Sequence, residues 1–500
     1  MRSVDLLRNR FSPVDTAWLR MEHPTNLMMI SGIFMFDDPL ELNDLYDVIE
    51  KRLLEFRRFR QKVVQPPLKF LPPRWVDDPH FDIDSHIHRV ALPEPGDQAA
   101  LQQLTNDLMS TPLDFSKPLW QIHLVENFGD GCALICRLHH CIADGIALMR
   151  VLLSLTDAAE SGTDVAGSGT VPPVKTGYSG ASPSGDLVHE GLEVLTNPEK
   201  RQAALRIGAE GAISLANLLL LPPDPPTPLK GALGVQKRCA WSLPIPLADV
   251  KAIGEVTDST VNDVLLTAVS GALGRYLRSR GESVGGLDIR AVVPVNLRPV
   301  DGPIKLGNAF GLVFLPLPIG IDDPLDRLRE LKRRMDGIKS TPEALVTFGI
   351  LNATGAAGPQ IEEIVVSIFE KKATTVMTNV PGPREVRYFA GKPIKGLMFW
   401  VPQSGRLGLG VSILSYAGDV LVGIASDAGL TPDPESIVEA THVEFDGLMQ
   451  LVTWARQADV QATATSAQPR CLGTTRDGRR CRNRPQTGSD YCHLHADQAG

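Results

Sequence analysis

Hydrophobic positions follow two different periods along the chain, and the changes between them outline its organisation. In some stretches they recur at every second residue, as in strands, and in others every three or four residues, as in amphipathic helices. In the first part of the chain this pattern predicts strands at 27–36, 120–126 and 132–138. It predicts helices at 40–54, 98–110 and 146–157. The two later strands flank Phe128-Gly129-Asp130-Gly131, so we expect a β-hairpin there.

A second series of alternating elements follows a long connection. Residues 161–185 are rich in glycine, serine, proline and threonine, which indicates a disordered crossover. Helical spacing at 187–220 and a proline-rich extended segment at 222–228 complete this connection. Beyond it, the pattern predicts a strong helix at 260–278 and a closing helix at 434–455. The strands expected between these helices are 289–295, 309–317, 374–379, 393–401, 409–416 and 420–425.

The order of these elements predicts an α/β protein built from two α/β halves. We expect the first half at 1–160, a crossover linker with helices at 161–234, and the second half at 235–457. A polar linker at 461–468 and a small C-terminal module at 468–496 are expected to follow. The length of 500 residues agrees with two or three domains.

Composition narrows the classes of protein to which the chain can belong. The net charge of −8 argues against a general nucleic-acid binder. Cys132, Cys136, Cys141 and Cys239 are scattered without a disulfide framework, which favours a reducing cytoplasm. Residues 1–13 are charged and lack the apolar core of a secretory signal, and no apolar run approaches the roughly 20 residues of a membrane span. We therefore expect a cytoplasmic protein that is soluble or peripheral to a membrane.

The segment with the strongest chemical signal is His139-His140-Cys141-Ile142-Ala143-Asp144-Gly145, at the end of an apolar strand-like run. Histidine has an ordinary pKa near neutrality and suits proton transfer, so one reading is a general base. A metal site and a structural polar pair are the alternatives. Because neighbours along a strand point to opposite faces, only one of the two histidines is expected to face a given cavity.

Several further segments match, in order, the bacterial wax ester synthase/diacylglycerol acyltransferase family, which the chain resembles over residues 10–457. The matching segments are Phe11-Ser12-Pro13-Val14-Asp15-Thr16-Ala17-Trp18, Pro118-Leu119-Trp120, the HHxxxDG run, Asn262-Asp263, Pro294-Val295-Asn296-Leu297-Arg298, Gly307-Asn308 and Asn379-Val380-Pro381-Gly382-Pro383. The sequence departs from the family at Asn296, where serine is usual.

The resemblance implies two chloramphenicol-acetyltransferase-like halves with the active site in a tunnel between them. It implies an acyl-CoA-dependent O-acyltransferase that esterifies diacylglycerol or a long-chain fatty alcohol, giving triacylglycerol or wax ester. An activated thioester does not require a serine nucleophile, and no Gly-x-Ser-x-Gly elbow is evident. The alternatives are another hydroxylated lipid or polyketide-like acceptor, and an inactive lipid-binding or droplet-associated protein.

The resemblance also assigns roles around the histidines. His140 would be the general base, and His139 would orient the loop or touch the substrate. Asp144 would organise the loop by pairing with an arginine, for which Arg60 is the first candidate and Arg298 the second. Gly145 would permit a tight turn or a close approach of the backbone.

The remaining candidates lie on other segments. Asn262 would help to hold the oxyanion, and the alternative is that Asn262 or Asp263 caps a helix. Trp120 is expected in the wall of the site. Thr378 and Asn379 would line the CoA or acyl channel, or belong to a turn after a strand. Catalysis is expected to need no cofactor, because acyl-CoA is a substrate.

The tail carries a second pattern that lies outside the family resemblance. Cys471, Cys481, Cys492 and His495, with His493 as an alternative ligand, can complete a tetrahedral zinc site. The alternative is a disordered tail. The tail is also rich in arginine, which permits contact with anionic lipid or nucleic acid. Separately, residues 218–226 could touch a bilayer or droplet surface through their leucines, or form an ordinary buried helix end.

Overall fold

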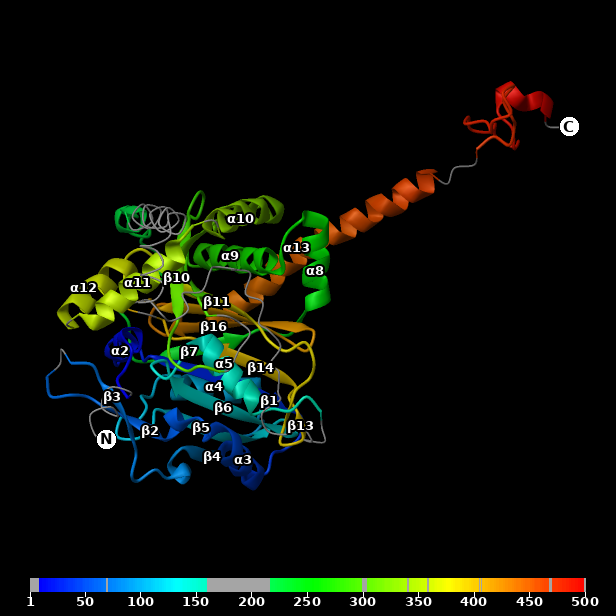
Figure 1. Ribbon diagram of the computed structural model, residues 1–500. Coiled ribbons are helices and arrows are strands. Elements are labelled where there is room, and N and C mark those ends of the chain that lie inside the picture. The colour runs from blue at the N-terminus through cyan, green and yellow to red at the C-terminus, as the bar shows by residue number, and fades with distance from the viewer. Residues whose placement is uncertain are drawn as a thin grey trace, which may run out of the picture.

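The computed structural model describes residues 9–68, 71–159, 216–298, 304–339, 341–357, 359–403, 405, 407–466 and 470–498. The expected crossover at 161–185, and the expected helix at 187–220 except for its last residues, lie outside this range. Figure 1 shows two α/β halves stacked on one another, the N-terminal elements in blue and cyan below and the later elements in green to orange above.

The N-terminal half is built on a mixed sheet with the strand order β14-β1-β6-β5-β4. Its first four strands in the chain are β1 (Met29–Phe36), β4 (Ile87–Ala91), β5 (Trp120–Phe128) and β6 (Gly131–His139). The expected hairpin is present as β5 and β6, paired from Trp120 opposite Leu138 to Phe128 opposite Gly131. Every residue of β6 is buried, because this strand is central in the sheet and is covered on both faces.

Helices and a small hairpin surround this sheet. The helices are α2 (Pro13–Arg20), α3 (Leu42–Val48), α4 (Gln98–Met109) and α5 (Gly145–Ser154). The short elements are η1 (Ile49–Leu53), η2 (Arg57–Arg60), η3 (Ile83–Ser85), β2 (Gln61–Val64) and β3 (Arg74–Asp77). The single helix expected at 40–54 is therefore two pieces, an α-helix followed by the π-helical turn η1.

The second half is built on a larger sheet with the order β10-β9-β11-β15-β16-β7, and β8 pairs with β16. Its strands are β7 (Lys237–Trp241), β8 (Ile245–Pro246), β9 (Ile289–Asn296), β10 (Phe310–Leu317), β11 (Thr375–Pro381), β15 (Leu409–Tyr416) and β16 (Asp419–Asp427). β11 runs parallel to both of its neighbours, β9 and β15, and the remaining pairs are antiparallel.

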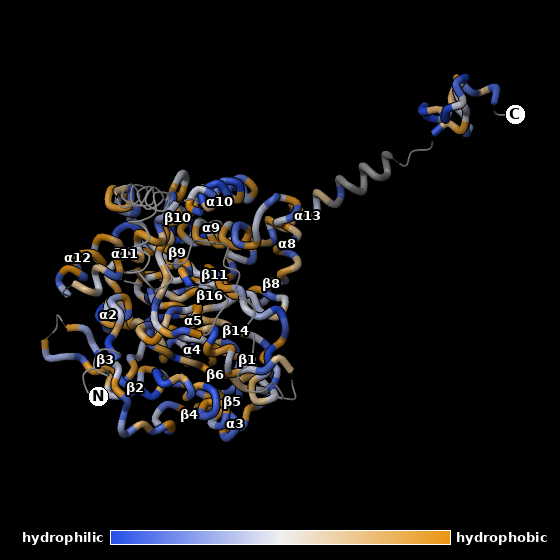
Figure 2. Tube along the Cα trace, in the orientation of Figure 1, coloured by the Kyte–Doolittle hydropathy of each residue, from blue (hydrophilic) through white to orange (hydrophobic). Residues whose placement is uncertain are grey.

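Two groups of helices flank this second sheet. One comprises α8 (Leu247–Thr257), α9 (Val261–Ser279), α10 (Pro324–Lys339) and α13 (Pro434–Ser466), and the other α11 (Glu343–Ala356) and α12 (Pro359–Glu370). The long helix α9 is buried along most of its length, and Figure 2 shows α10 above it as a largely hydrophilic helix. β12 (Tyr388–Phe389) and β13 (Lys392–Pro393) form a separate two-stranded ribbon.

A strand exchange ties the halves together. β14 (Gly396–Trp400) comes from the later part of the chain but pairs antiparallel with β1, from Ser31 opposite Trp400 to Met35 opposite Gly396. Its side chains join a cluster between the sheets in which the rings of Trp241 and Trp400 lie 5.7 Å apart. The alternation of hydrophobic residues predicted a strand at 393–401. Such alternation indicates which side chains share a face of the sheet, but it does not indicate which strand lies alongside.

The end of the chain differs from the expectation. Helix α13 continues to Ser466 and takes in most of the polar linker predicted at 461–468. Alanine and glutamine in that stretch are good helix formers, so a helix is compatible with a composition that suggested a linker. Among the helices of the described residues, none is long and apolar enough to cross a bilayer.

Candidate active site

The paired histidines stand where β6 ends, and they face in opposite directions. The backbone amide of His140 donates to the carbonyl of Met28 at 2.7 Å, and that of His139 donates to the carbonyl of Leu119 at 3.0 Å. His140 lines a cavity of about 460 Å³, whereas His139 is fully buried away from it. The alternation expected along a strand therefore selects His140 as the histidine that can meet a ligand.

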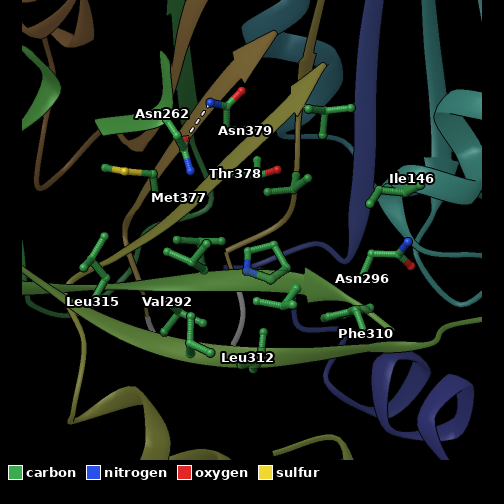
Figure 3. A pocket seen from close by; sticks show the side chains of 18 of the residues that line it. Ile146, Asn262, Val292, Asn296, Phe310, Leu312, Leu315, Met377, Thr378 and Asn379 are labelled. Carbon is green, nitrogen blue, oxygen red and sulfur yellow. Dashed lines mark hydrogen bonds between the residues drawn. The ribbon is translucent and has the colours of Figure 1, made fainter. Parts of the chain in front are cut away.

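The cavity lies between the two halves. Its wall on the N-terminal side includes Trp18, His140 and the start of α5, and its other walls come from α9, β9, β10 and β11. Figure 3 shows Ile146 of α5 with Val292 and Phe310 of the second half around this space. Six of the predicted site residues line it, namely His140, Asp144, Gly145, Asn262, Thr378 and Asn379. Most of the remaining wall is apolar.

The imidazole of His140 is packed between aromatic rings. The Trp18 ring stacks on it with centroids 4.1 Å apart, and Phe310 approaches it edge-on at 5.7 Å. Burial, and then the neighbouring His139, lower the pKa of His140 to about 3, against the opposing effects of its own carbonyl and of Asn308. A lowered pKa keeps the ring neutral at physiological pH, which is the form that can accept a proton.

The loop that carries His140 is held by a loop of the other half. The side-chain amide of Asn308 donates to the backbone carbonyl of His140 at 2.9 Å and to the Asp15 carboxylate at 2.8 Å. Gly307 donates to the carbonyl of Ile142 at 2.9 Å and accepts from the amide of Asp144 at 3.2 Å. Gly307 has φ +95°, a conformation that glycine adopts without strain.

Asp144 fixes the end of the same loop. Its Oδ1 accepts from the amide of Ala147 at 2.9 Å and so caps α5, and its Oδ2 accepts from the amide of Ala309 at 3.1 Å. The guanidinium of Arg298 lies 3.2 Å from Oδ2. The prediction that Arg60 pairs with Asp144 is wrong, and Arg60 lies exposed at the end of η2. The partner is Arg298, the second candidate.

His139 braces the loop from the opposite side. Its Nδ1 accepts from the amide of Cys141 at 3.1 Å, and its Nε2 lies 3.4 Å from the Glu22 carboxylate. The ring of Phe115 packs edge-on against it at 5.6 Å. Of the two roles predicted for His139, this environment fits orientation of the loop and not contact with a ligand in the cavity.

Asn262 faces the cavity from the first turn of α9. Asn379 Nδ2 donates to Asn262 Oδ1 at 2.7 Å, the dashed bond of Figure 3. The side-chain Nδ2 of Asn262 can therefore donate a hydrogen bond to a group in the cavity. The N-cap residue is Thr260, which exchanges hydrogen bonds with Asp263 in a capping box. Of the two residues expected to satisfy amides at this helix end, Asp263 is therefore confirmed and Asn262 is not.

Two other predictions need correction. Trp120 is core and not cavity wall: its Nε1 donates to the carbonyl of Phe59 at 2.8 Å, and its ring stacks on His86 at 4.4 Å. Gly145 has no positive φ, and a Cβ there would meet only Val401 at 3.8 Å, an ordinary contact. The backbone at that position does not require glycine.

The residues that build this site without having been predicted to do so are Asp15, Trp18 and Asn308. All three lie in segments that match the family, but their function depends on contacts across nearly 300 positions of sequence. The matching motif was the available signal; nothing in its local pattern indicates that Asn308 bonds the backbone of His140.

The tail brings its predicted ligands together. The ligand atoms of Cys471, Cys481, Cys492 and His495 all lie within 4.8 Å of one another. His495 Nδ1 is 3.3 Å from the sulfur of Cys492, and the sulfurs of Cys481 and Cys492 are 3.8 Å apart. His493 is exposed and outside the cluster, so the alternative ligand is not supported.

Comparison with known proteins agrees with this geometry. Residues 11–265 match the family profile described as "Wax ester synthase/diacylglycerol acyltransferase catalytic domain", and residues 306–449 match "WS/DGAT C-terminal domain". The chain belongs to the wax ester synthase/diacylglycerol acyltransferase family. The Mycobacterium tuberculosis protein named "Probable diacyglycerol O-acyltransferase tgs1" is 29% identical over 464 residues, covering 90% of this chain and 97% of its own.

Two solved structures share the fold. The wax ester synthase/diacylglycerol acyltransferase from Marinobacter aquaeolei VT8 superposes with a TM-score of 0.66 at 20% identity, covering 89% of this chain and 100% of that one. The first condensation domain of the calcium-dependent antibiotic synthetase gives 0.56 at 13% identity, covering 89% and 96%. The two-half architecture expected from the resemblance is confirmed.

The pairing of Asp144 with Arg298 makes a prediction for stability. Asp144→Asn keeps an oxygen for the helix cap but leaves the Arg298 charge without its partner. The side chain of Arg298 is 22% exposed, so we expect a loss of about 2–3 kcal/mol of unfolding free energy, below the ~3–5 of fully buried pairs. Urea denaturation followed by circular dichroism measures this loss.

The control is Asp326→Asn, which breaks the exposed pair between Asp326 and Arg329. Exposed pairs contribute at most about 1 kcal/mol, so this variant should unfold almost like the wild type. Equal, small effects of both substitutions would show that the Asp144 pair does not hold the loop.

Proposed function

We propose that this chain is an acyl-CoA-dependent O-acyltransferase that esterifies diacylglycerol or a long-chain fatty alcohol, giving triacylglycerol or wax ester. The observation that carries the proposal is the neutral His140 in an apolar cavity whose walls come from both halves. Relatives named as diacyglycerol O-acyltransferases along most of the chain support it.

The cavity suits long apolar chains. At about 30 Å³ for a water-sized group, 460 Å³ accommodates on the order of 15 methylene-sized groups. Its wall includes Val292, Leu312, Leu315 and Met377, which offer no hydrogen bonds through their side chains. A chain of hydrocarbon is held there by burial of its surface, while the few polar groups remain for the reacting atoms.

The mechanism follows from the placement of His140 and Asn262. The neutral imidazole accepts the proton of the acceptor hydroxyl as its oxygen bonds to the thioester carbonyl carbon. The oxyanion that forms accepts a hydrogen bond from the Asn262 amide. The carbon–sulfur bond then breaks, and the imidazolium returns its proton to the departing thiolate. The ester and free CoA leave, no acyl-enzyme forms, and the chemistry needs no cofactor.

The first test compares His140→Ala with the wild type. Thiol release from palmitoyl-CoA is measured with diacylglycerol or hexadecanol as acceptor, and the ester is identified by mass spectrometry. General-base catalysis contributes roughly 10²–10⁴-fold, so kcat/KM should fall by about that factor. His80→Ala, which removes an exposed histidine outside the cavity, should retain wild-type activity.

Undiminished ester formation by His140→Ala would refute the assignment of the base. A wild-type protein that binds these lipids without turnover would favour the inactive lipid-binding alternative. Turnover only with other hydroxylated acceptors would keep the chemistry and correct the substrate.

We also propose that the protein acts in the cytoplasm on a lipid surface, which it meets through α12 and the neighbouring residues 219–220. Ile361, Ile364 and Ile368 recur on one side of α12 and are 54%, 61% and 38% exposed. Leu219 and Leu220 are also exposed, whereas Leu218 is a buried helix end. Lys372, just beyond α12, donates to the carbonyl of Leu219 at 2.8 Å, so these apolar groups lie on adjoining elements.

The double substitution Ile361→Glu/Ile364→Glu tests this surface. Burial of one such side chain contributes about 1.5–3 kcal/mol, so binding to vesicles of phosphatidylcholine and diacylglycerol should weaken at least tenfold in co-sedimentation. Val443→Glu, at an exposed apolar position of α13, is the control and should bind like the wild type. Unchanged binding by the double variant would place the contact elsewhere.

For the tail, we propose a structural zinc ion held by Cys471, Cys481, Cys492 and His495. Zinc–sulfur bonds of about 2.3 Å at tetrahedral angles place sulfurs roughly 3.8 Å apart, and the Cys481–Cys492 separation is 3.8 Å. Backbone amides of Gly473 and Asn483 also point at the sulfurs of Cys471 and Cys481, at 3.3 and 3.4 Å. Such donors stabilise thiolates, the form that binds zinc.

The adjacent histidines supply a matched test. The full chain should contain one zinc ion per molecule by elemental analysis after dialysis. His495→Ala should lose most of it, whereas His493→Ala should keep it. A metal content that is unaffected by His495→Ala, or absent from the wild type purified with zinc, would contradict the proposal.

A further inference from the structure

A second cavity of about 50 Å³ lies beneath α12, beside the first. Its wall comes from α2, α11, α12 and β10. Trp18, Val292 and Leu312 line both cavities, and Trp18 is the ring that stacks on His140. These three shared side chains lie between the two cavities, so a ligand would have to pass them to reach the second cavity from the first.

Two acidic side chains stand out in this largely apolar wall, Glu362 and the less buried Glu370. The carboxyl of Glu362, on the inner side of α12, lines the cavity and is only 3% exposed. Its Oε2 lies 3.5 Å from Arg20 Nη1, a long contact, and the same nitrogen donates to the carbonyl of Ala357 at 3.1 Å. Its Oε1 is buried and has no hydrogen-bond partner among the described residues.

A buried acceptor oxygen without a donor is unfavourable, and proteins rarely retain one without a reason. Burial raises the pKa of Glu362 to about 7, against the opposing effect of Arg20. The end of a hydrocarbon chain would leave Oε1 unsatisfied, and a ligand carboxylate would be repelled by the ionised form. A hydroxyl is small and donates one hydrogen bond, which is what this oxygen lacks.

We propose that the cavity beneath α12 is a subsite for a hydroxyl group carried by a lipid whose chain lies in the main cavity, with Glu362 Oε1 as the acceptor of its hydrogen bond. The volume fits this role, because about 50 Å³ holds one or two water-sized groups, such as a hydroxyl with its carbon. The inference rests on the proposed function for its choice of ligand. It defines a preferred acceptor, a lipid with a second hydroxyl at a distance from the reacting one.

The experiment is a ladder of α,ω-alkanediols compared with 1-alkanols of equal length. Equilibrium binding to the full chain is measured by calorimetry without acyl-CoA, so it does not depend on turnover. The wild type should bind one range of diol lengths about tenfold or more tightly than the matching alkanols, a typical effect of one hydrogen bond to a carboxylate. Kinetics with palmitoyl-CoA should show the same preference in the KM of the acceptor.

Three variants separate a ligand contact from a structural ion pair. Glu362→Leu should lose the diol preference and bind alkanols as well as the wild type does. Glu362→Gln keeps an acceptor oxygen and should retain part of the preference. Arg20→Gln breaks the pair with Glu362 but leaves Oε1 in place, so it should keep the preference.

Loss of affinity for diols and alkanols alike in both Arg20→Gln and Glu362→Leu would overturn the subsite and assign the pair a structural role. A wild type without any diol preference would also overturn it. Diol-selective binding without ester formation would retain the subsite and reject the proposed function, so the two failures are distinguishable.

Discussion

The side-chain amide of Asn308 joins the two halves at the loop that carries His140. One of its hydrogens binds the carboxylate of Asp15 and the other binds the backbone carbonyl of His140. Gly307 adds two backbone hydrogen bonds to the same loop, and Arg298 pairs with Asp144 at its end. The position of the His140 ring is therefore set by contacts from the second half, although the ring belongs to the first.

This arrangement explains why the His140 ring is neutral at physiological pH. Trp18 and Phe310, from opposite halves, cover the imidazole and remove it from water. Burial disfavours the charged ring, so the neutral form prevails and a proton acceptor is ready at physiological pH. Neither half alone encloses the ring, and the later part of the chain also supplies β14, which pairs with β1 of the first sheet.

Much of the fold could be predicted from hydrophobic periodicity, because β6, α9 and the hairpin of β15 and β16 carry regular patterns within a short stretch of chain. Period-two alternation also predicted that only one of His139 and His140 would face a cavity. Contacts between distant residues were beyond that reasoning. The partner of Asp144 is Arg298 and not Arg60, and no local pattern distinguishes two arginines. Thr260 rather than Asn262 caps α9 for a similar reason, since cap geometry depends on where the helix begins.

The protonation state of the His140 ring is the most direct test. It depends on the contacts between the halves that position the ring and on the aromatic rings that enclose it, and the proposed proton transfer depends on it. Histidine labelled with ¹³C at Cε1, with the signal assigned by comparison with His140→Gln, can be titrated by NMR from pH 5 to pH 8. The account predicts that the His140 signal stays that of a neutral imidazole across this range, since the lowered pKa lies below it. A titration midpoint near 6.5, the ordinary value for a solvated histidine, would contradict it.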